Sequence, residues 1–265
     1  MKTPVRDFTR DYELGCSAAL RELERCVLGC DYGATSWTTR QEASRIAELL
    51  ELHPRDTLLD VGAGSGWPGL YLAQLLGCDV VLVDLPLVGL RVALERAAAD
   101  GLKMRCRTIV ADGAALPFRD GSFDAVSHSD VLCCLEAKLS VLQACRRVAR
   151  AAAKMAFSVI APASSLSASE HEIAIESGPP FVDVCGDYAD LLHQSGWRLL
   201  ERCDVSEEFA RSLRISIEAV KARADALTEV FGREDFAERL ERREATLGAI
   251  ERKLLKREIF VARAS

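Results

Sequence analysis

Short apolar runs and longer amphipathic stretches alternate through the central part of the chain, from residue 57 to residue 161. The short runs are continuously apolar, as expected for strands of a sheet that is covered on both faces. Helical stretches separate them at 68–76, 87–99 and 138–150. Five strands are predicted, at 57–61, 79–84, 106–111, 123–129 and 153–161. This alternation predicts βαβ units and an α/β fold with a doubly wound, mostly parallel sheet.

Before this region the apolar positions follow a helical period. Residues 11–29 and 40–52 both read as amphipathic helices, so we expect an N-terminal helical cap over residues 1–52. The remainder, 53–265, is predicted to be one domain built on the sheet. Right-handed crossovers place the carboxyl ends of its parallel strands at one edge, where ligands bind in folds of this kind.

After residue 161 the strict alternation ends. Residues 162–185 are rich in Ser and Pro and are predicted to form a cap loop over the ligand-binding edge. Strands at 197–205 and 257–264 bring the predicted sheet to seven strands. Between them, residues 207–255 show two amphipathic helical stripes, which predict a helical insertion before the last strand.

Composition narrows the class of protein. The chain has 265 residues and a formal net charge of −6, with acids and bases interspersed, which disfavours nucleic acid as a partner. No uninterrupted apolar run reaches the roughly 18 residues of a membrane span, and the first residues carry no apolar signal region. Ten cysteines then indicate free thiols in a reducing cytoplasm, and without CxxC pairs no metal site is expected.

The first predicted strand runs into a glycine-rich turn, "LLDVGAGSGW" at residues 58–67. Gly62, Gly64 and Gly66 have the spacing GxGxG, whereas a dinucleotide fingerprint requires GxGxxG. The third glycine of that fingerprint would fall on Trp67, which is too large for close packing of helix on strand. An NAD(P)-dependent oxidoreductase is therefore disfavoured, but it stays open as an alternative function.

Carboxylates lie at or near the ends of the first three strands: Asp60, Asp84 and Asp112. Asp60 stands in an apolar strand, and a buried carboxylate requires a partner such as backbone amides or a cationic ligand. Asp84 is placed to accept both hydroxyls of a ribose, and Asp112 to accept from an adenine amino group. Phosphates would be repelled by this arrangement, whereas a nucleoside that carries a positive charge would be attracted.

These segments, "LLDVGAGSGWPGLYLA", "VVLVDLP" and "IVADGAALPFRDGSFDAV", resemble the ordered motifs of class I S-adenosylmethionine-dependent methyltransferases with a Rossmann-like fold. They are similar in particular to the small-molecule, methyltransferase type 11 subgroup. The N-terminal "ATSWTTRQEA" and the late helices are similar to those of N-methyltransferases acting on sarcosine or dimethylglycine.

The resemblance implies that S-adenosyl-L-methionine is the cofactor and assigns residues to it. The glycine turn would pass the homocysteine part, Asp60 and the turn amides would hold the amino group, and Asp84 would hold the ribose. Asp112 would hold the adenine amine, flanked by Ala111 and Gly113. The full set of implied cofactor-binding residues is Trp37, Thr38, Asp60, Gly62, Ala63, Gly64, Gly66, Asp84, Leu85, Ala111, Asp112, Gly113 and Ser129.

Methyl transfer from a sulfonium depends mainly on alignment, and a general base is optional. His128, at the end of the fourth strand, and His171, in the predicted cap loop, are the candidate catalytic residues. Cys133 and Cys134 follow at the same edge and are interpreted as packing residues. The expected partner is a small-molecule acceptor, whose methylated atom is left open, for a monomer or homodimer. A non-catalytic module that binds S-adenosylmethionine stays open as a second alternative.

Overall fold

The computed structural model describes residues 8–33 and 36–265, which contain one seven-stranded sheet. The strand order is β3-β2-β1-β4-β5-β7-β6, and β7 is antiparallel to both of its neighbours. The strands are β1 (Thr57–Val61), β2 (Asp79–Asp84), β3 (Cys106–Val110), β4 (Phe123–Ser129), β5 (Ala149–Pro162), β6 (Trp197–Asp204) and β7 (Leu255–Ala264). The predicted mostly parallel, doubly wound α/β sheet is confirmed.

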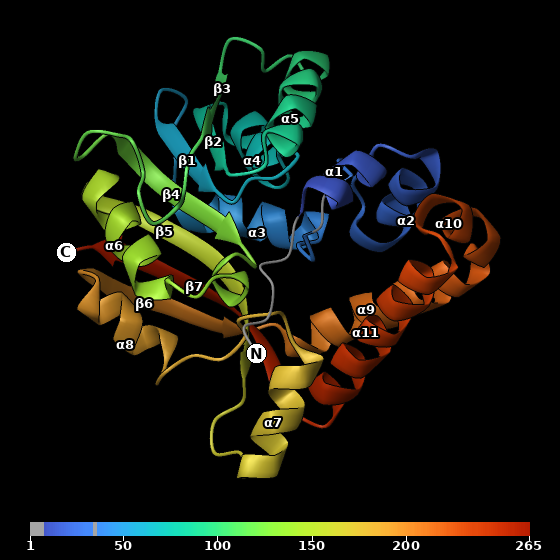
Figure 1. Ribbon diagram of the computed structural model, residues 1–265. Helices are drawn as coiled ribbons and strands as arrows, with labels where there is room; N and C mark the ends of the chain where they lie inside the picture. Colours follow the sequence, from blue (N-terminus) through green and yellow to red (C-terminus); the bar gives the residue numbers. More distant parts are fainter. Residues whose placement is uncertain (1–7, 34–35) are drawn as a thin grey trace.

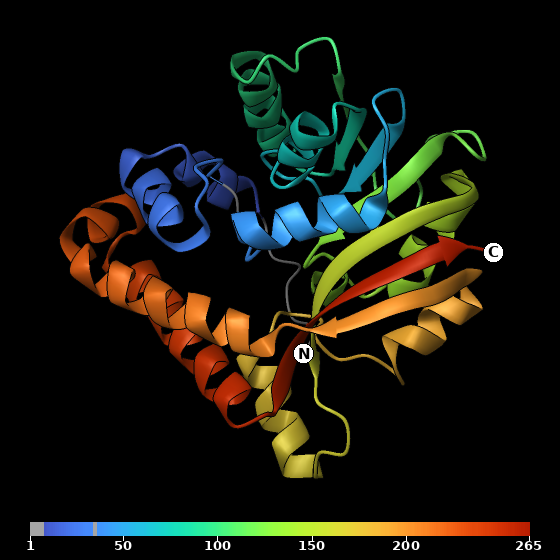
Figure 2. The same cartoon turned by 180° about the vertical axis from the view of Figure 1, so that it is seen from behind.

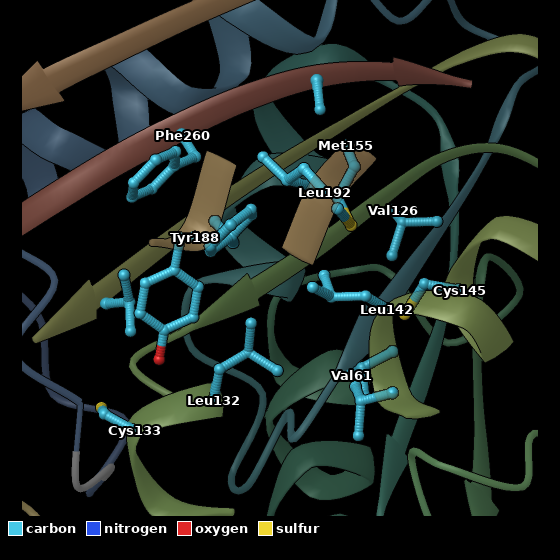
Figure 3. Close-up of a cluster of buried hydrophobic side chains, with 14 of the residues drawn as sticks. Val61, Val126, Leu132, Cys133, Leu142, Cys145, Met155, Tyr188, Leu192 and Phe260 are labelled. Atoms are coloured by element: carbon cyan, nitrogen blue, oxygen red, sulfur yellow. The ribbon is translucent and has the colours of Figure 1, made fainter. Parts of the chain in front are cut away.

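Helices cover both faces of the sheet (Figures 1 and 2). On one face lie α3 (Arg40–Leu50), α4 (Gly69–Leu76) and α5 (Leu87–Ala99); on the other lie α6 (Lys138–Val148) and α8 (Tyr188–Gln194). Each face has its own apolar core. The core on the face covered by α6 and α8 is called the second core. In it, Tyr188 of α8 packs beside Phe260 of β7, and the side chains of Leu132 and Cys133 lie close by (Figure 3).

Parallel register brings the ends of β1, β2 and β3 to the same edge. Val61 pairs with Val83, and Asp84 pairs with Val110, so the segments that follow these strands emerge side by side. β4 lies on the other side of β1, with Ser127 paired to Asp60. The predicted ligand-binding edge is therefore formed by the turns after β1, β2, β3 and β4.

A helical arm extends from this edge (Figures 1 and 2). It consists of α9 (Ser206–Ala222), α10 (Ala224–Phe231) and α11 (Arg233–Glu251), and it reaches the N-terminal helices α1 (Thr9–Gly15) and α2 (Ala18–Leu28). Leu23 of α2 shares a small apolar core with Val220 and Leu227 of the arm, and Arg239 of α11 forms an ion pair with the buried Asp11 of α1. The helices α1 and α2 are thus packed against the arm, which precedes the last strand.

Three element predictions differ from the structure. The expected helix 11–29 is two helices, because Ser17 accepts a hydrogen bond from the Leu20 amide and starts α2 anew. The expected loop 162–185 contains helix α7 (Ala168–Ser177), which begins with a capping box formed by Ser167 and Glu170. The insertion has three helices instead of two, since Arg223, with φ −117° and ψ +24°, divides the first predicted stripe into α9 and α10.

The helix predicted to end at residue 150 ends at Val148, and β5 begins at Ala149. Ala149 pairs with Phe123 of β4, so the neighbouring strand decides the conformation of this alanine-rich stretch. Within the described residues, no helix has the length and apolar character that a membrane crossing requires. The division into a cap at 1–52 and a domain at 53–265 stays a prediction.

Candidate functional site

The glycine-rich turn after β1 is hydrogen-bonded to β2, and side chains from other segments pack directly on it. The amides of Gly62 and Ala63 both donate to the Val83 carbonyl, at 2.8 and 3.0 Å. Gly62 has φ +67°, and a Cβ there would lie 2.5 Å from Cγ2 of Val131. A Cβ on Gly64 would lie 2.8 Å from the Tyr12 hydroxyl. Only glycine fits these two positions without displacing a neighbour.

Asp84, the last residue of β2, fixes the same turn from the side. Its carboxylate accepts hydrogen bonds from the Gly64 amide at 2.6 Å and from its neighbouring Leu85 amide at 2.7 Å. The hydroxyl of Tyr12, on α1, donates to it at 3.4 Å. Burial raises the pKa of Asp84, and the two backbone hydrogen bonds oppose that rise. The carboxylate therefore faces the turn, in the place where the sequence predicted the ribose.

Asp60 is wholly buried near the end of β1 and only half satisfied. Ser127 of β4 donates to Oδ1 at 2.6 Å, while Oδ2 lies against the Gly69 backbone without a well-formed hydrogen bond, although this backbone contact lowers the pKa of the carboxyl group. Burial raises the pKa of Asp60 to about 7, and the nearby Asp84 carboxylate adds to the rise. A buried carboxylate oxygen without a donor is costly, so this position fits a cationic group of a ligand.

Apolar surface is exposed beyond β2 and β3. Leu85, which follows β2, and Val110, the last residue of β3, have side chains that are 58% and 52% exposed. Ala111, Asp112 and Gly113 follow β3, and the Ala111 amide donates to the Asp84 carbonyl. Asp112 is exposed and accepts from the Ala114 amide with one oxygen. An exposed apolar shelf beside a carboxylate suits the ring of an adenine and its amino group.

The two candidate catalytic histidines lie on different elements. His128 of β4 is completely buried, stacks on Phe157 with 4.5 Å between ring centroids, and has no partner for either ring nitrogen. Burial lowers its pKa to about 3. His171 lies instead on α7, partly exposed, with Nε2 3.2 Å from a carboxylate oxygen of Asp183. The structure thus keeps His128 near the edge as a neutral ring and places His171 beside a carboxylate at the surface.

Ser129, Trp37 and Thr38 lie near the strand ends, and two of them have structural partners. Thr38 is buried; its carbonyl accepts from Nε1 of Trp67 at 2.8 Å, and its hydroxyl accepts from Arg257. Trp37 packs edge-on against Phe209 of α9. Ser129 is the half-buried last residue of β4. Their predicted contacts with a cofactor stay predictions.

Cys133 and Cys134 follow β4 in a short 3-10 turn. Both thiols donate to the Asp130 carbonyl, at 3.2 and 3.5 Å. Cys133 is buried within the second core, and the pKa of its thiol is raised by its neighbour Cys134 and by burial. Their interpretation as packing residues is consistent with this environment.

Four residues at this edge lie outside the set predicted from the sequence: Tyr12, Glu42, Asp130 and Arg257. Tyr12 reaches the turn because α1 folds back onto α5, and Arg257 is buried between Glu42 of α3 and Asp130 after β4. The motif Thr39-x-x-Glu42 signals a helix start, but nothing local indicates a partner more than 200 positions away.

The sheet order, with an antiparallel last-but-one position and a glycine turn after β1, defines a class I methyltransferase fold. It is shared with a putative sarcosine dimethylglycine methyltransferase from Galdieria sulphuraria, with a TM-score of 0.77 and 20% identity over 84% of this chain and 82% of that one. Residues 59–157 match the family described as "Methyltransferase domain", and the chain carries a domain of this S-adenosylmethionine-dependent family.

Two characterised relatives extend the similarity. Methyltransferase GfsG of Streptomyces halstedii is 28% identical over 198 residues, 73% of this chain and 70% of that protein. Phosphoethanolamine N-methyltransferase 3 of Arabidopsis thaliana is 24% identical over 197 residues, 74% of this chain. The match spans only 40% of the length of the plant enzyme. The predicted methyltransferase family and its cofactor class are confirmed; the individual site residues stay predictions.

Proposed function

We propose that the protein is an enzyme that transfers the methyl group of S-adenosyl-L-methionine to a small-molecule acceptor. The observation that carries the proposal is the pair of carboxylates at the glycine turn, Asp60 buried and Asp84 half-buried. Asp84 is fixed by the Gly64 and Leu85 amides, and Asp60 presents an oxygen without a partner. A cationic nucleoside satisfies both groups, whereas the pyrophosphate of a dinucleotide would be repelled by them.

The residues at the edge fit this cofactor part by part. Asp84 would accept the ribose hydroxyls, while Asp60 and the amides of the turn would hold the amino group. Leu85 and the segment Ala111–Gly113 would enclose the adenine, with Asp112 accepting from its amine. Trp37, Thr38 and Ser129 would contact the methionine end. Bound in this way, the cofactor supplies an activated methyl group on its sulfonium.

The chain then contributes alignment and the exclusion of water. Transfer is an in-line displacement: the acceptor forms a bond to the methyl carbon as the carbon–sulfur bond breaks, and that electron pair returns to sulfur. Holding two reactants in line is worth an effective molarity of about 10⁵ M or more. Tyr12 covers the turn from α1, and the Asp11–Arg239 ion pair ties α1 to the arm, so α1 is held over the turn.

A neutral amine acceptor requires no base, whereas a phenol or a carbon acid does. A base works best with a pKa near the operating pH, and the pKa of His128 lies near 3. We therefore propose that His128 acts as a base only if the methyl acceptor donates a hydrogen bond to one of its ring nitrogens. His171, paired with Asp183, is proposed as a residue of the acceptor entrance on α7.

Isothermal titration calorimetry with S-adenosylmethionine, S-adenosylhomocysteine and NADH tests the cofactor. We expect binding of the first two and none of NADH, and the reverse result would contradict the proposal. Catalysis is tested with methyl-labelled S-adenosylmethionine and a metabolite extract below about 3 kDa. A labelled small molecule is expected; binding without any labelled product would indicate a non-catalytic module. Light scattering distinguishes a monomer from a homodimer.

A further inference from the structure

A buried cluster of charges lies next to the proposed methyl-transfer site. Arg257 of β7 is 1% exposed, and its Nε and Nη2 donate to the two carboxylate oxygens of Asp130, at 2.9 and 3.0 Å. Its Nη1 donates to Glu42, and Nη2 also donates to the Thr38 hydroxyl at 3.2 Å. The cluster of Arg257, Glu42 and Asp130 thus joins β7, α3 and the end of β4.

The cluster does not balance its charges. One guanidinium faces two carboxylates, and all three side chains are 10% exposed or less. Burial lowers the pKa of Arg257, but the two carboxylates outweigh burial and raise it, so the cation is permanent. Glu42 also accepts from the Thr39 amide at the positive N-terminus of α3, which offsets part of its charge. One cation and two carboxylates therefore leave the cluster with a net negative charge.

Asp130 is held rigidly beside the glycine turn. Its backbone has φ +55°, and its amide donates to the Ser158 carbonyl at 3.0 Å, while the Ser158 hydroxyl donates to its carboxylate at 3.1 Å. The next residue, Val131, packs so closely on Gly62 that a Cβ there would lie 2.5 Å from it. Asp130 therefore directly precedes, in the chain, the residue that packs on the turn along which the methionine end of the cofactor is proposed to pass.

We propose that the cluster of Arg257, Glu42 and Asp130 makes the site selective for the charged sulfonium donor over its neutral thioether product. The inference rests on the proposed function. S-adenosylmethionine and S-adenosylhomocysteine share every part except the methyl group and its positive charge. A fixed negative charge in a site of low effective dielectric stabilises the cationic donor and not the product. The cluster thereby favours exchange of product for donor after each turnover.

The test is calorimetry of both compounds on Asp130→Asn and Glu42→Gln, which each remove one negative charge while preserving side-chain shape. We expect the preference for donor over product to fall about tenfold in Asp130→Asn, equivalent to about 1.4 kcal/mol. A smaller fall in the same direction is expected in Glu42→Gln, because the helix N-terminus already offsets its charge. Urea unfolding of each variant identifies samples that remain folded.

Glu258→Gln is the matched control. Glu258 is the next residue of β7 and is also buried in an ion pair with an arginine, Arg202, but it belongs to the pairing with β6. Its removal is expected to leave the ratio of the two affinities within about twofold of wild type. Equal losses of both affinities in the folded Asp130 and Glu42 variants would show a purely structural cluster and overturn the inference. Failure of the wild type to bind either compound would overturn the proposed function as well.

Discussion

Replacing Asp84 by asparagine is the most direct perturbation of the proposed cofactor site. The carboxylate accepts from the Gly64 and Leu85 amides, and the Tyr12 hydroxyl lies within reach of it. Asparagine keeps the shape of the side chain but retains one acceptor oxygen and adds an amide group that only donates. The Asp84→Asn variant can therefore satisfy either the turn or a ribose hydroxyl through its oxygen, but not both amides and the ribose together.

The expected loss follows from these contacts. A hydrogen bond to a charged group contributes about 1.5–3 kcal/mol, and the ribose would lose at least one such partner. An affinity lower by a factor of about 10 to 100 is expected, which corresponds to about 1.4–2.8 kcal/mol. Because the turn amides lose a charged acceptor too, the free energy of unfolding should fall by about 1 kcal/mol.

The assay is calorimetry with S-adenosylhomocysteine at pH 8, because burial raises the pKa of Asp84 and an alkaline buffer favours its ionised form. Asp79→Asn serves as the control, because Asp79 begins the same strand at the opposite edge of the sheet. Its affinity should equal that of the wild type. If Asp84→Asn also binds within about twofold of the wild type while remaining folded, the assignment of Asp84 to the ribose is refuted.

Three further predictions concern stability and are measured by urea unfolding. Burial raises the pKa of Asp60 to about 7. The contribution of this group to the free energy of unfolding is therefore complete below pH ~4, and it is lost as the pH rises to 7. Asp60→Asn should gain stability relative to wild type across that window, and a constant difference would contradict it. Burial lowers the pKa of His128 to about 3, so its contribution is present above pH ~6.5 and is lost on acidification. Acidification below pH ~6.5 should therefore destabilise the wild type more than His128→Phe, so that the difference in free energy of unfolding shifts in favour of the variant. A shift in favour of the wild type would count against a neutral buried ring. Gly62→Ala should cost about 1–3 kcal/mol, since it combines positive φ with a contact on Val131. Gly101→Ala, with φ +75° and no atom within 4 Å of its Cβ, should cost less, and equal losses would show that strain alone acts at the turn.

Much of the sheet could be predicted because its strands are short, continuously apolar and separated by helical periods. Residues 57–61, 79–84 and 123–129 have the predicted bounds for this reason. The start of β5 was not predicted, and residues 149–150 were wrongly given to the preceding helix, since the alanines of this stretch suit a helix as well as a strand and pairing with β4 decides. Helix α7 could have been found from Ser167 and Glu170, whose spacing is that of a capping box.

The residues of the candidate site also fall into those that the sequence could predict and those that it could not. Asp60 and Asp84 were predictable, because a parallel sheet collects the ends of its strands at one edge and a carboxylate there stands out against apolar neighbours. The partners that complete the edge were not, because they come from segments far apart in the chain. Tyr12 meets Asp84 across 72 positions, and Arg257 meets Glu42 across 215. Such contacts depend on the packing of α1, α3 and β7 around the sheet, and no local pattern records that packing.

The two carboxylates of the turn differ in a way that separates their roles. Asp84 is satisfied by backbone amides before any ligand arrives, so it is a fixed acceptor that shapes the turn. Asp60 keeps one oxygen unpaired and, with a pKa of about 7, is partly protonated at neutral pH. An ammonium group placed at that oxygen would favour the ionised form and release the proton. Cofactor binding should therefore release protons near pH 7, with an amount that depends on Asp60 and not on Asp84. Calorimetry of S-adenosylhomocysteine in buffers of different ionisation enthalpy measures this release, and its persistence in Asp60→Asn would place the amino group elsewhere.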